Sequence, residues 1–155
     1  APALGVRQCM NSSEIIEKFE SRDSHSIWEA TWEILRCADK TELKKLMPYL
    51  KKFKEIINGL DLGGAIYSNK NSANLALSHI EQSVTNICHC SLFTQSPKFS
   101  PSKEAEWGHV SLKGSEIKKE LYEEHYDVVC NYCGNQYFVR EVHGWHVPWY
   151  EWKIA

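Results

Sequence analysis

Apolar residues in the first half of the chain recur at intervals of three and four, which is the spacing of one face of an α-helix. The segments with this spacing are 11–19, 26–37, 39–58 and 72–87. Residues that commonly cap helices, such as Asn11, Ser26 and Ser72, stand at their starts, and a glycine ends the third. Pro48 divides that third segment, so it holds either one kinked helix or two helices, the second beginning at the proline. We expect four or five antiparallel helices in this half.

The pattern changes at Cys88, after which short aromatic-rich segments replace the helical spacing. Alternating apolar and polar residues predict a strand over 136–142, a turn at 143–144 and a returning strand over 145–154. Pro148 places that last strand at a sheet edge or a bulge. Shorter strands are expected at 91–94, 107–112 and 126–129, with an exposed loop over 95–105 and a weak surface helix over 115–124.

Four of the six cysteines stand as a C-x-C and a C-x-x-C-G, about forty residues apart; they are Cys88, Cys90, Cys130 and Cys133. Zinc takes four soft ligands tetrahedrally, and two close thiolate pairs on neighbouring extended segments are typical of a structural zinc ribbon. We therefore expect these cysteines to bind a structural Zn²⁺. Two alternatives remain: a histidine such as His89 replaces one thiolate, or the cysteines are disulfides or unrelated buried thiols.

The predicted fold class is accordingly α+β. A helical subdomain over residues 1–87 packs on a zinc-ribbon-like antiparallel sheet over residues 88–155, and the two are expected to form one compact unit.

Composition is that of a soluble globular protein, with 155 residues, 43% of them hydrophobic and 25% charged. The net charge of −2 gives no general attraction to nucleic acid or to an anionic membrane. Apolar stretches fall far short of the roughly 18 residues that a membrane span needs, and no secretory signal is visible. Cys9 and Cys37 show no disulfide-framework spacing, so we expect reduced cysteines and a cytoplasmic protein.

The sequence contains no zincin, deaminase, nucleophile-elbow, phosphate-loop or dinucleotide motif, so we expect no catalysis. A zinc-dependent hydrolase is the most distant alternative, because no open ligand set is evident. A lysine-rich helix face supports a second alternative, a zinc-ribbon nucleic-acid-binding protein. Its candidate contacts are Lys44, Lys45, Lys51, Lys52 and Lys54, and no arginine accompanies them.

Aromatic and acidic residues near the C-terminus are the candidate partner-binding residues: Trp145, Trp149, Tyr150, Trp152, Glu120, Glu123 and Glu124. The tryptophans either fill the core between sheet and helices or lie exposed, where such rings are typical of protein-binding hot spots. Clustered carboxylates would favour a basic partner.

In size, in expected cytosolic character and in its acidic and aromatic surfaces, the chain resembles the bacterial immunity proteins of polymorphic or contact-dependent toxin systems. The resemblance is one of format, and no family motif transfers to particular residues. It implies a non-catalytic protein that binds and neutralises a cognate toxin, such as a nuclease, with tight one-to-one stoichiometry.

Overall fold

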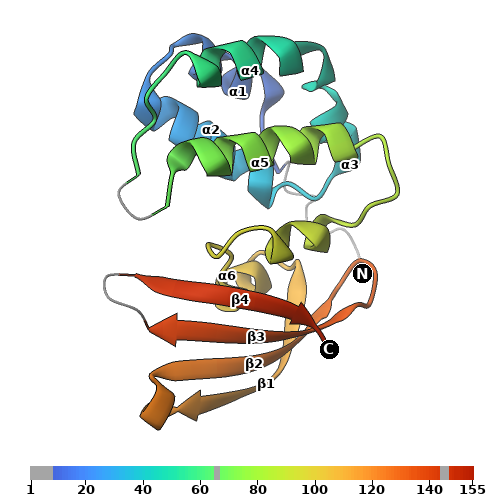
Figure 1. Cartoon of the computed structure of the whole chain (residues 1–155). Helices are drawn as coiled ribbons and strands as arrows, with labels where there is room; N and C mark the ends of the chain where they lie inside the picture. The colour runs from blue at the N-terminus through green and yellow to red at the C-terminus, as the bar shows by residue number, and fades with distance from the viewer. Residues whose placement is uncertain (1–8, 65–66, 144–146) are drawn as a thin grey trace. The chain divides into compact units, whose positions relative to one another are not determined.

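The computed structural model describes residues 9–64, 67–143 and 147–155, and it divides the chain into two compact units. The helical unit covers residues 1–87 and the sheet unit covers residues 88–155 (Figure 1). The fold class is therefore the α+β class that the sequence predicts. Among the described helices, none combines the length and the apolar character that crossing a membrane requires.

The described part of the helical unit contains six helical segments: α1 (Ser12–Glu20), α2 (Ser24–Arg36), α3 (Lys40–Lys44), the 3₁₀ helix η1 (Met47–Tyr49), α4 (Leu50–Asn58) and α5 (Asn69–Gln82). Pro48 lies in the first turn of η1, so the expected third helix is divided at the proline. Two caps differ from the prediction. Asp23 rather than Ser26 caps α2, and Ser68 rather than Ser72 caps α5, because both residues accept backbone N–H bonds one turn earlier.

The core of the helical unit lies where α5 packs against α2, α3 and α4. Phe19 of α1 and Phe53 of α4 are fully buried, and their rings stack with centroids 4.1 Å apart. Helix α5 ends before Val84 and Ile87, which are 61% and 45% exposed. The expected helical segment over 72–87 therefore extends five residues beyond the end of α5.

Cys9 and Cys37 form a disulfide, which corrects the expectation that all six cysteines are reduced. Cys9 precedes α1 and Cys37 follows α2 directly, and the two helices pack on each other. The chain therefore brings the two residues together, with Cα atoms 5.1 Å apart, although 28 positions separate them in the sequence.

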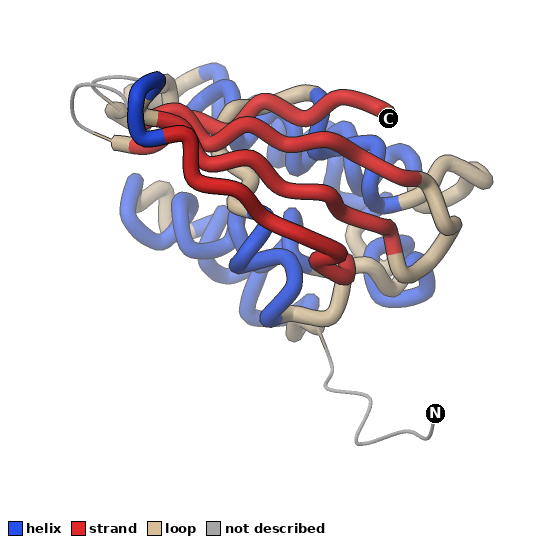
Figure 2. The backbone as a smooth tube through the Cα atoms, turned by 90° about the horizontal axis from the view of Figure 1, so that it is seen from below, coloured by secondary structure: helices blue, strands red, loops and turns tan. Residues whose placement is uncertain are grey.

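The sheet unit contains η2 (His89–Thr94), α6 (Pro101–Glu106), β1 (Val110–Lys118), η3 (Lys119–Leu121), β2 (Glu123–Cys130), β3 (Gln136–His143) and β4 (Pro148–Ile154). The four strands of the described residues lie side by side in the order β1-β2-β3-β4, all antiparallel (Figure 2). Pro148 begins the edge strand β4, as the sequence predicts. The predicted strand at 136–142 is confirmed as β3.

Three expectations for this unit are wrong. Residues 91–94 belong to the 3₁₀ helix η2 rather than to a strand, and the expected loop over 95–105 contains most of α6. Residues 115–124 hold the end of β1, the short 3₁₀ helix η3, a turn at Tyr122 and the start of β2 rather than one surface α-helix. Strand β1 is an edge strand whose residues from 112 to 117 are all exposed, so it lacks the apolar alternation that would have identified it.

The two faces of the sheet differ in polarity. The inner face carries buried residues that neighbour one another across β2, β3 and β4, namely Tyr126, Val139 and Trp152. Helix η2 packs against β4 and α6 packs against β1. On the outer face, the corresponding neighbours are His125, Arg140 and Glu151, and Arg140 is salt-bridged to Glu151 at 3.5 Å. The alternation that predicted β3 reflects this difference.

Candidate metal centre

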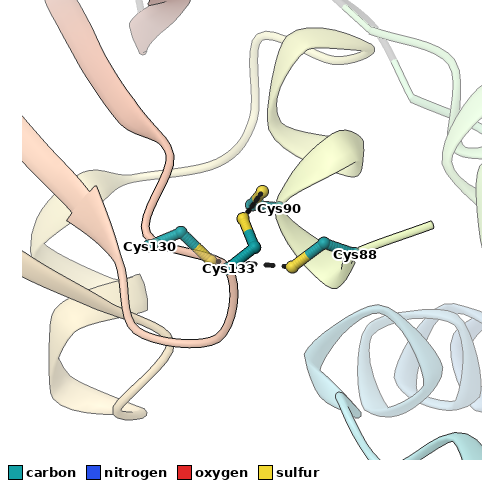
Figure 3. A group of neighbouring side chains, drawn as sticks. All are labelled: Cys88, Cys90, Cys130 and Cys133. Atoms are coloured by element: carbon teal, nitrogen blue, oxygen red, sulfur yellow. Dashed lines mark hydrogen bonds between the residues drawn. The ribbon is translucent and has the colours of Figure 1, made fainter. Parts of the chain in front are cut away.

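Two knuckles bring the four predicted cysteine ligands together. Cys88 and Cys90 lie at the start of η2, Cys130 ends β2, and Cys133 follows in the turn before β3 (Figure 3). All four Sγ atoms lie within 4.8 Å of one another. The Sγ atoms of Cys88 and Cys130 are 3.7 Å apart, and those of Cys90 and Cys133 are 3.5 Å apart.

These distances match the geometry of a bound ion. Metal–sulfur bonds of about 2.3 Å in a tetrahedron place neighbouring sulfur atoms about 3.8 Å apart. The four side chains point toward a common centre from two segments of the chain (Figure 3). The cluster therefore fits a metal site with four protein ligands, as the cysteine spacing predicts.

Backbone hydrogen bonds shape the second knuckle. The N–H of Gly134 donates to the carbonyl of Cys130 at 3.0 Å, and the N–H of Cys130 donates to the carbonyl of Asn135 at 2.8 Å. Gly134 has a φ of +78°, the left-handed region in which glycine is unstrained. The N–H of Tyr132 points at the Sγ atom of Cys130 at 3.4 Å. Such donors stabilise the negative charge of a thiolate.

Burial is the main influence on the protonation of the first pair. It raises the pKa of the Cys88 and Cys90 thiols above the ordinary value. The hydroxyl of Tyr137 opposes this effect at Cys90, because it donates to the Sγ atom at 3.0 Å. At Cys133, desolvation also raises the pKa, but hydrogen bonds from the Asn135 backbone and the neighbouring thiols outweigh it and lower the pKa overall. A central cation favours all four thiolates by offsetting their mutual repulsion.

Among the described residues of the sheet unit, two further groups of ligand-type side chains come together. His89, Glu104 and His109 form a buried group, and Glu124, Glu141 and His143 form a partly exposed one. His89 is thus grouped with Glu104 and His109 rather than with the four sulfur atoms. Sequence reasoning missed Glu104 and His109 as ligands, because the three residues of the buried group come from three separate segments and share no motif spacing.

The predicted aromatic contact residues fall into three situations. Trp152 is only 5% exposed: its ring lies 4.5 Å from that of Phe93, and its indole N–H donates to the Phe99 carbonyl at 2.8 Å. It is a core residue, so its assignment to a contact surface is wrong. Trp149 and Tyr150 are half-buried and line a hollow of about 340 Å³. Trp145 lies outside the described residues.

The predicted acidic contact residues lie around the connection between β1 and β2. Glu120 is exposed within η3. Glu123 is half-buried and lies 2.7 Å from His125 and 3.4 Å from Arg140. Glu124 belongs to the partly exposed ligand group described above. Glu120 therefore has the most freedom to meet a partner, whereas Glu123 already has two basic neighbours.

The lysines of the nucleic-acid alternative are largely neutralised within the helical unit. Lys45 pairs with Glu42, Lys52 with Glu20 and Lys54 with Glu81, at 2.8, 2.7 and 2.6 Å respectively. Lys44 and Lys51 are exposed. The nearby Phe53, a candidate for base stacking, is fully buried against Phe19. A groove for a single strand combines unneutralised cations with exposed aromatic rings, and the pairing of three of these lysines and the burial of Phe53 both weaken that interpretation.

Comparison of the chain with protein-family models, with curated proteins and with solved structures gave no match.

Proposed function

We propose that the chain is a zinc-stabilised, non-catalytic protein-binding module that binds and neutralises a cognate toxin, as the bacterial immunity proteins do. The observation that carries the proposal is a group of exposed apolar side chains at the connection between β1 and β2, here called the apolar tip. Its members are Ile117, Leu121 and Tyr122, which are 65%, 59% and 74% exposed.

The apolar tip is exposed on a backbone that is held in place. Tyr122 has a φ of +54°, a left-handed conformation that is uncommon for residues other than glycine. Its carbonyl accepts a hydrogen bond from the N–H of His143 at 2.9 Å, which ties the tip to β3. Because the backbone is already fixed, little further conformational entropy is lost when Tyr122 binds a partner. A large aromatic side chain held in this way is favoured as an interface anchor.

Carboxylates flank the apolar tip in the sequence and define the chemistry of the partner. Glu116, Glu120, Glu123 and Glu124 lie within eight positions of one another, and Lys118, Lys119 and Arg140 offset three of them. The resulting excess of negative charge around an apolar centre suits a basic protein surface, such as that of a nuclease domain. Apolar contacts would supply affinity, and the charges would speed association.

Zinc is the ion we propose for the four cysteines, with a structural role. Four thiolates provide soft ligands and leave no coordination position for water or substrate. In this proposal the ion fixes the two knuckles, and through Cys130 it fixes the C-terminal end of β2. Binding takes place at the apolar tip and not at the metal.

Partner capture from the native host tests the proposal. A tagged chain is used as bait, the retained protein is identified, and the purified pair is titrated. We expect one-to-one binding with a nanomolar Kd, and about a tenfold or greater loss of affinity in Tyr122→Ala. Ile154→Ala is the matched control, because Ile154 is 70% exposed in the same unit but lies outside the tip.

A survival assay connects binding to function. Cells that express the captured partner should survive when they also express the wild-type chain or Ile154→Ala, and should fail to grow with Tyr122→Ala. Two results would overturn the proposal: unchanged partner affinity in Tyr122→Ala, or retention of nucleic acid alone with a steep salt dependence.

A further inference from the structure

We infer that His89, Glu104 and His109 form a second metal site, which binds one divalent transition-metal ion through two imidazole nitrogens and one carboxylate oxygen. The inference goes beyond the proposed toxin binding and does not depend on it. It rests on the burial, the geometry and the donor chemistry of the three residues.

The three residues converge from three segments of the sheet unit. His89 lies in η2 between two of the cysteine ligands, Glu104 lies in α6, and His109 immediately precedes β1. They are 5%, 2% and 4% exposed, and one ligand atom from each lies within 4.8 Å of the others. A glutamate buried so completely is normally paired with another polar or charged group or bound to a metal.

Contacts among the three residues hold their ligand atoms close together. The backbone N–H of His109 donates to the backbone carbonyl of Glu104 at 2.9 Å, and the ring Nδ1 of His109 lies 2.5 Å from Oε2 of Glu104. The imidazole rings of His89 and His109 have centroids 4.4 Å apart and are inclined by 59°. Metal–nitrogen bonds of about 2.0–2.1 Å require ligand atoms about 3.3 Å apart, so Nδ1 of His109 and Oε2 of Glu104 would move apart by about 0.8 Å when an ion binds.

The donor chemistry of the group suits a divalent ion. The rings of His89 and His109 have centroids 4.4 Å apart, and one ligand atom of each lies close to the Glu104 carboxylate. A divalent ion takes neutral imidazoles together with a carboxylate. Two histidines and one glutamate are a known set for transition ions that keep a further coordination position.

Two partly exposed aromatic rings adjoin the site. Tyr132, from the second cysteine knuckle, is 53% exposed, and its ring centroid lies 5.9 Å from that of His109 and 6.3 Å from that of His89. Trp107 is 40% exposed, and its ring centroid lies 6.2 Å from that of His109. Water or a small anion completing the coordination would therefore meet these rings at the boundary with solvent.

Titration of the metal-free full-length chain with Co²⁺ tests the inference. We expect two equivalents to bind. One should produce the thiolate-to-metal charge-transfer band of the four cysteines, and the other should add ligand-field absorption without such a band. The variant Glu104→Gln keeps the shape of the buried side chain and should lose the second equivalent only. Its retained charge-transfer band would show that the sheet unit is still folded.

The matched control is His125→Gln. His125 also contacts a glutamate, Glu123, at 2.7 Å, but it lies on the outer face of the sheet and belongs to none of the ligand groups found among the described residues. This variant should bind both equivalents.

Two results would overturn the inference without any variant. They are a single equivalent bound to the wild-type chain, or a second equivalent with a thiolate band of its own. Nitrogen chemical shifts of the His89 and His109 side chains provide a further readout, because both should move as the second equivalent of Zn²⁺ is added. Unchanged shifts would show that the residues form only a buried polar cluster.

Discussion

Removal of the ion from the four cysteines should unfold the sheet unit and leave the helical unit folded. The perturbation is either a strong chelator or the variant Cys130→Ser, which removes the ligand at the end of β2. The sheet unit spans residues 88–155. At the usual 0.05–0.15 kcal/mol per residue, a unit of that length has a net stability of about 3–10 kcal/mol.

The metal that we propose would contribute on a larger scale than this total. Structural zinc supplies about 10–16 kcal/mol of apparent binding free energy, which in such sites is also folding free energy. Loss of that contribution exceeds the whole net stability of the unit. We therefore expect unfolding on chelation rather than a lowered melting temperature.

Amide resonances provide the assay, because the two units report separately. After chelation, the dispersed signals of β2 and β3 should collapse, while those of α2 and α5 should remain. Zinc returned in excess should restore them in the wild-type chain but not in Cys130→Ser. Dispersed signals from β2 and β3 in the metal-free chain would refute the reasoning, because the core around Trp152 would then hold the sheet without an ion.

Three further outcomes are expected. Trp152→Ala should cost about 3–5 kcal/mol of folding free energy, because it removes a buried ring. Denaturant titration should show a smaller loss for Trp149→Ala, whose ring is half-buried. Equal losses for the two variants would contradict the assigned burial. Reduction of the Cys9–Cys37 disulfide should lower the stability of the helical unit by about 3–4 kcal/mol, because the unfolded chain regains loop entropy. The helical circular dichroism signal should then be lost at a lower denaturant concentration. An unchanged transition would show that the disulfide does not restrict the unfolded chain in this way. Gly134→Ala should weaken metal binding about 5–30-fold in competition with a chromophoric chelator, because left-handed backbone costs about 1–2 kcal/mol with a side chain; unaltered affinity would show that the knuckle relaxes.

Helices and the inner strands could be predicted because their burial is one-sided. The apolar spacing of Ile15 and Phe19 reflects a single buried face, and the alternation of β3 reflects a sheet with one apolar and one charged face. Strand β1 shows no such contrast, because its exposed edge buries few side chains. Its charged residues then match the composition of a surface helix as well as that of a strand.

The four cysteines and the group of His89, Glu104 and His109 also differ in how far the sequence could predict them. Close spacing in the sequence made the four cysteines recognisable, because each knuckle is a local structure. His89, Glu104 and His109 meet only after α6 has packed against β1 and η2 has packed against β4. No local sequence pattern indicates that three residues will come together through such tertiary packing. Trp152 shows the same limit: its composition suited a contact surface, and only its contact with Phe93 identified it as core.

The strand order of the sheet unit predicts the order in which its contacts form during folding. Each described strand pairs with its neighbour in the sequence, so each pairing closes a short loop, whereas the two sulfur contacts span 42 and 43 positions. Short closures form early, and the knuckles should meet after the strands have paired. An ion captured at that late step leaves the folding rate nearly unchanged and slows unfolding. The metal would then determine the lifetime of each folded molecule, and hence its resistance to proteases that act on opened chains.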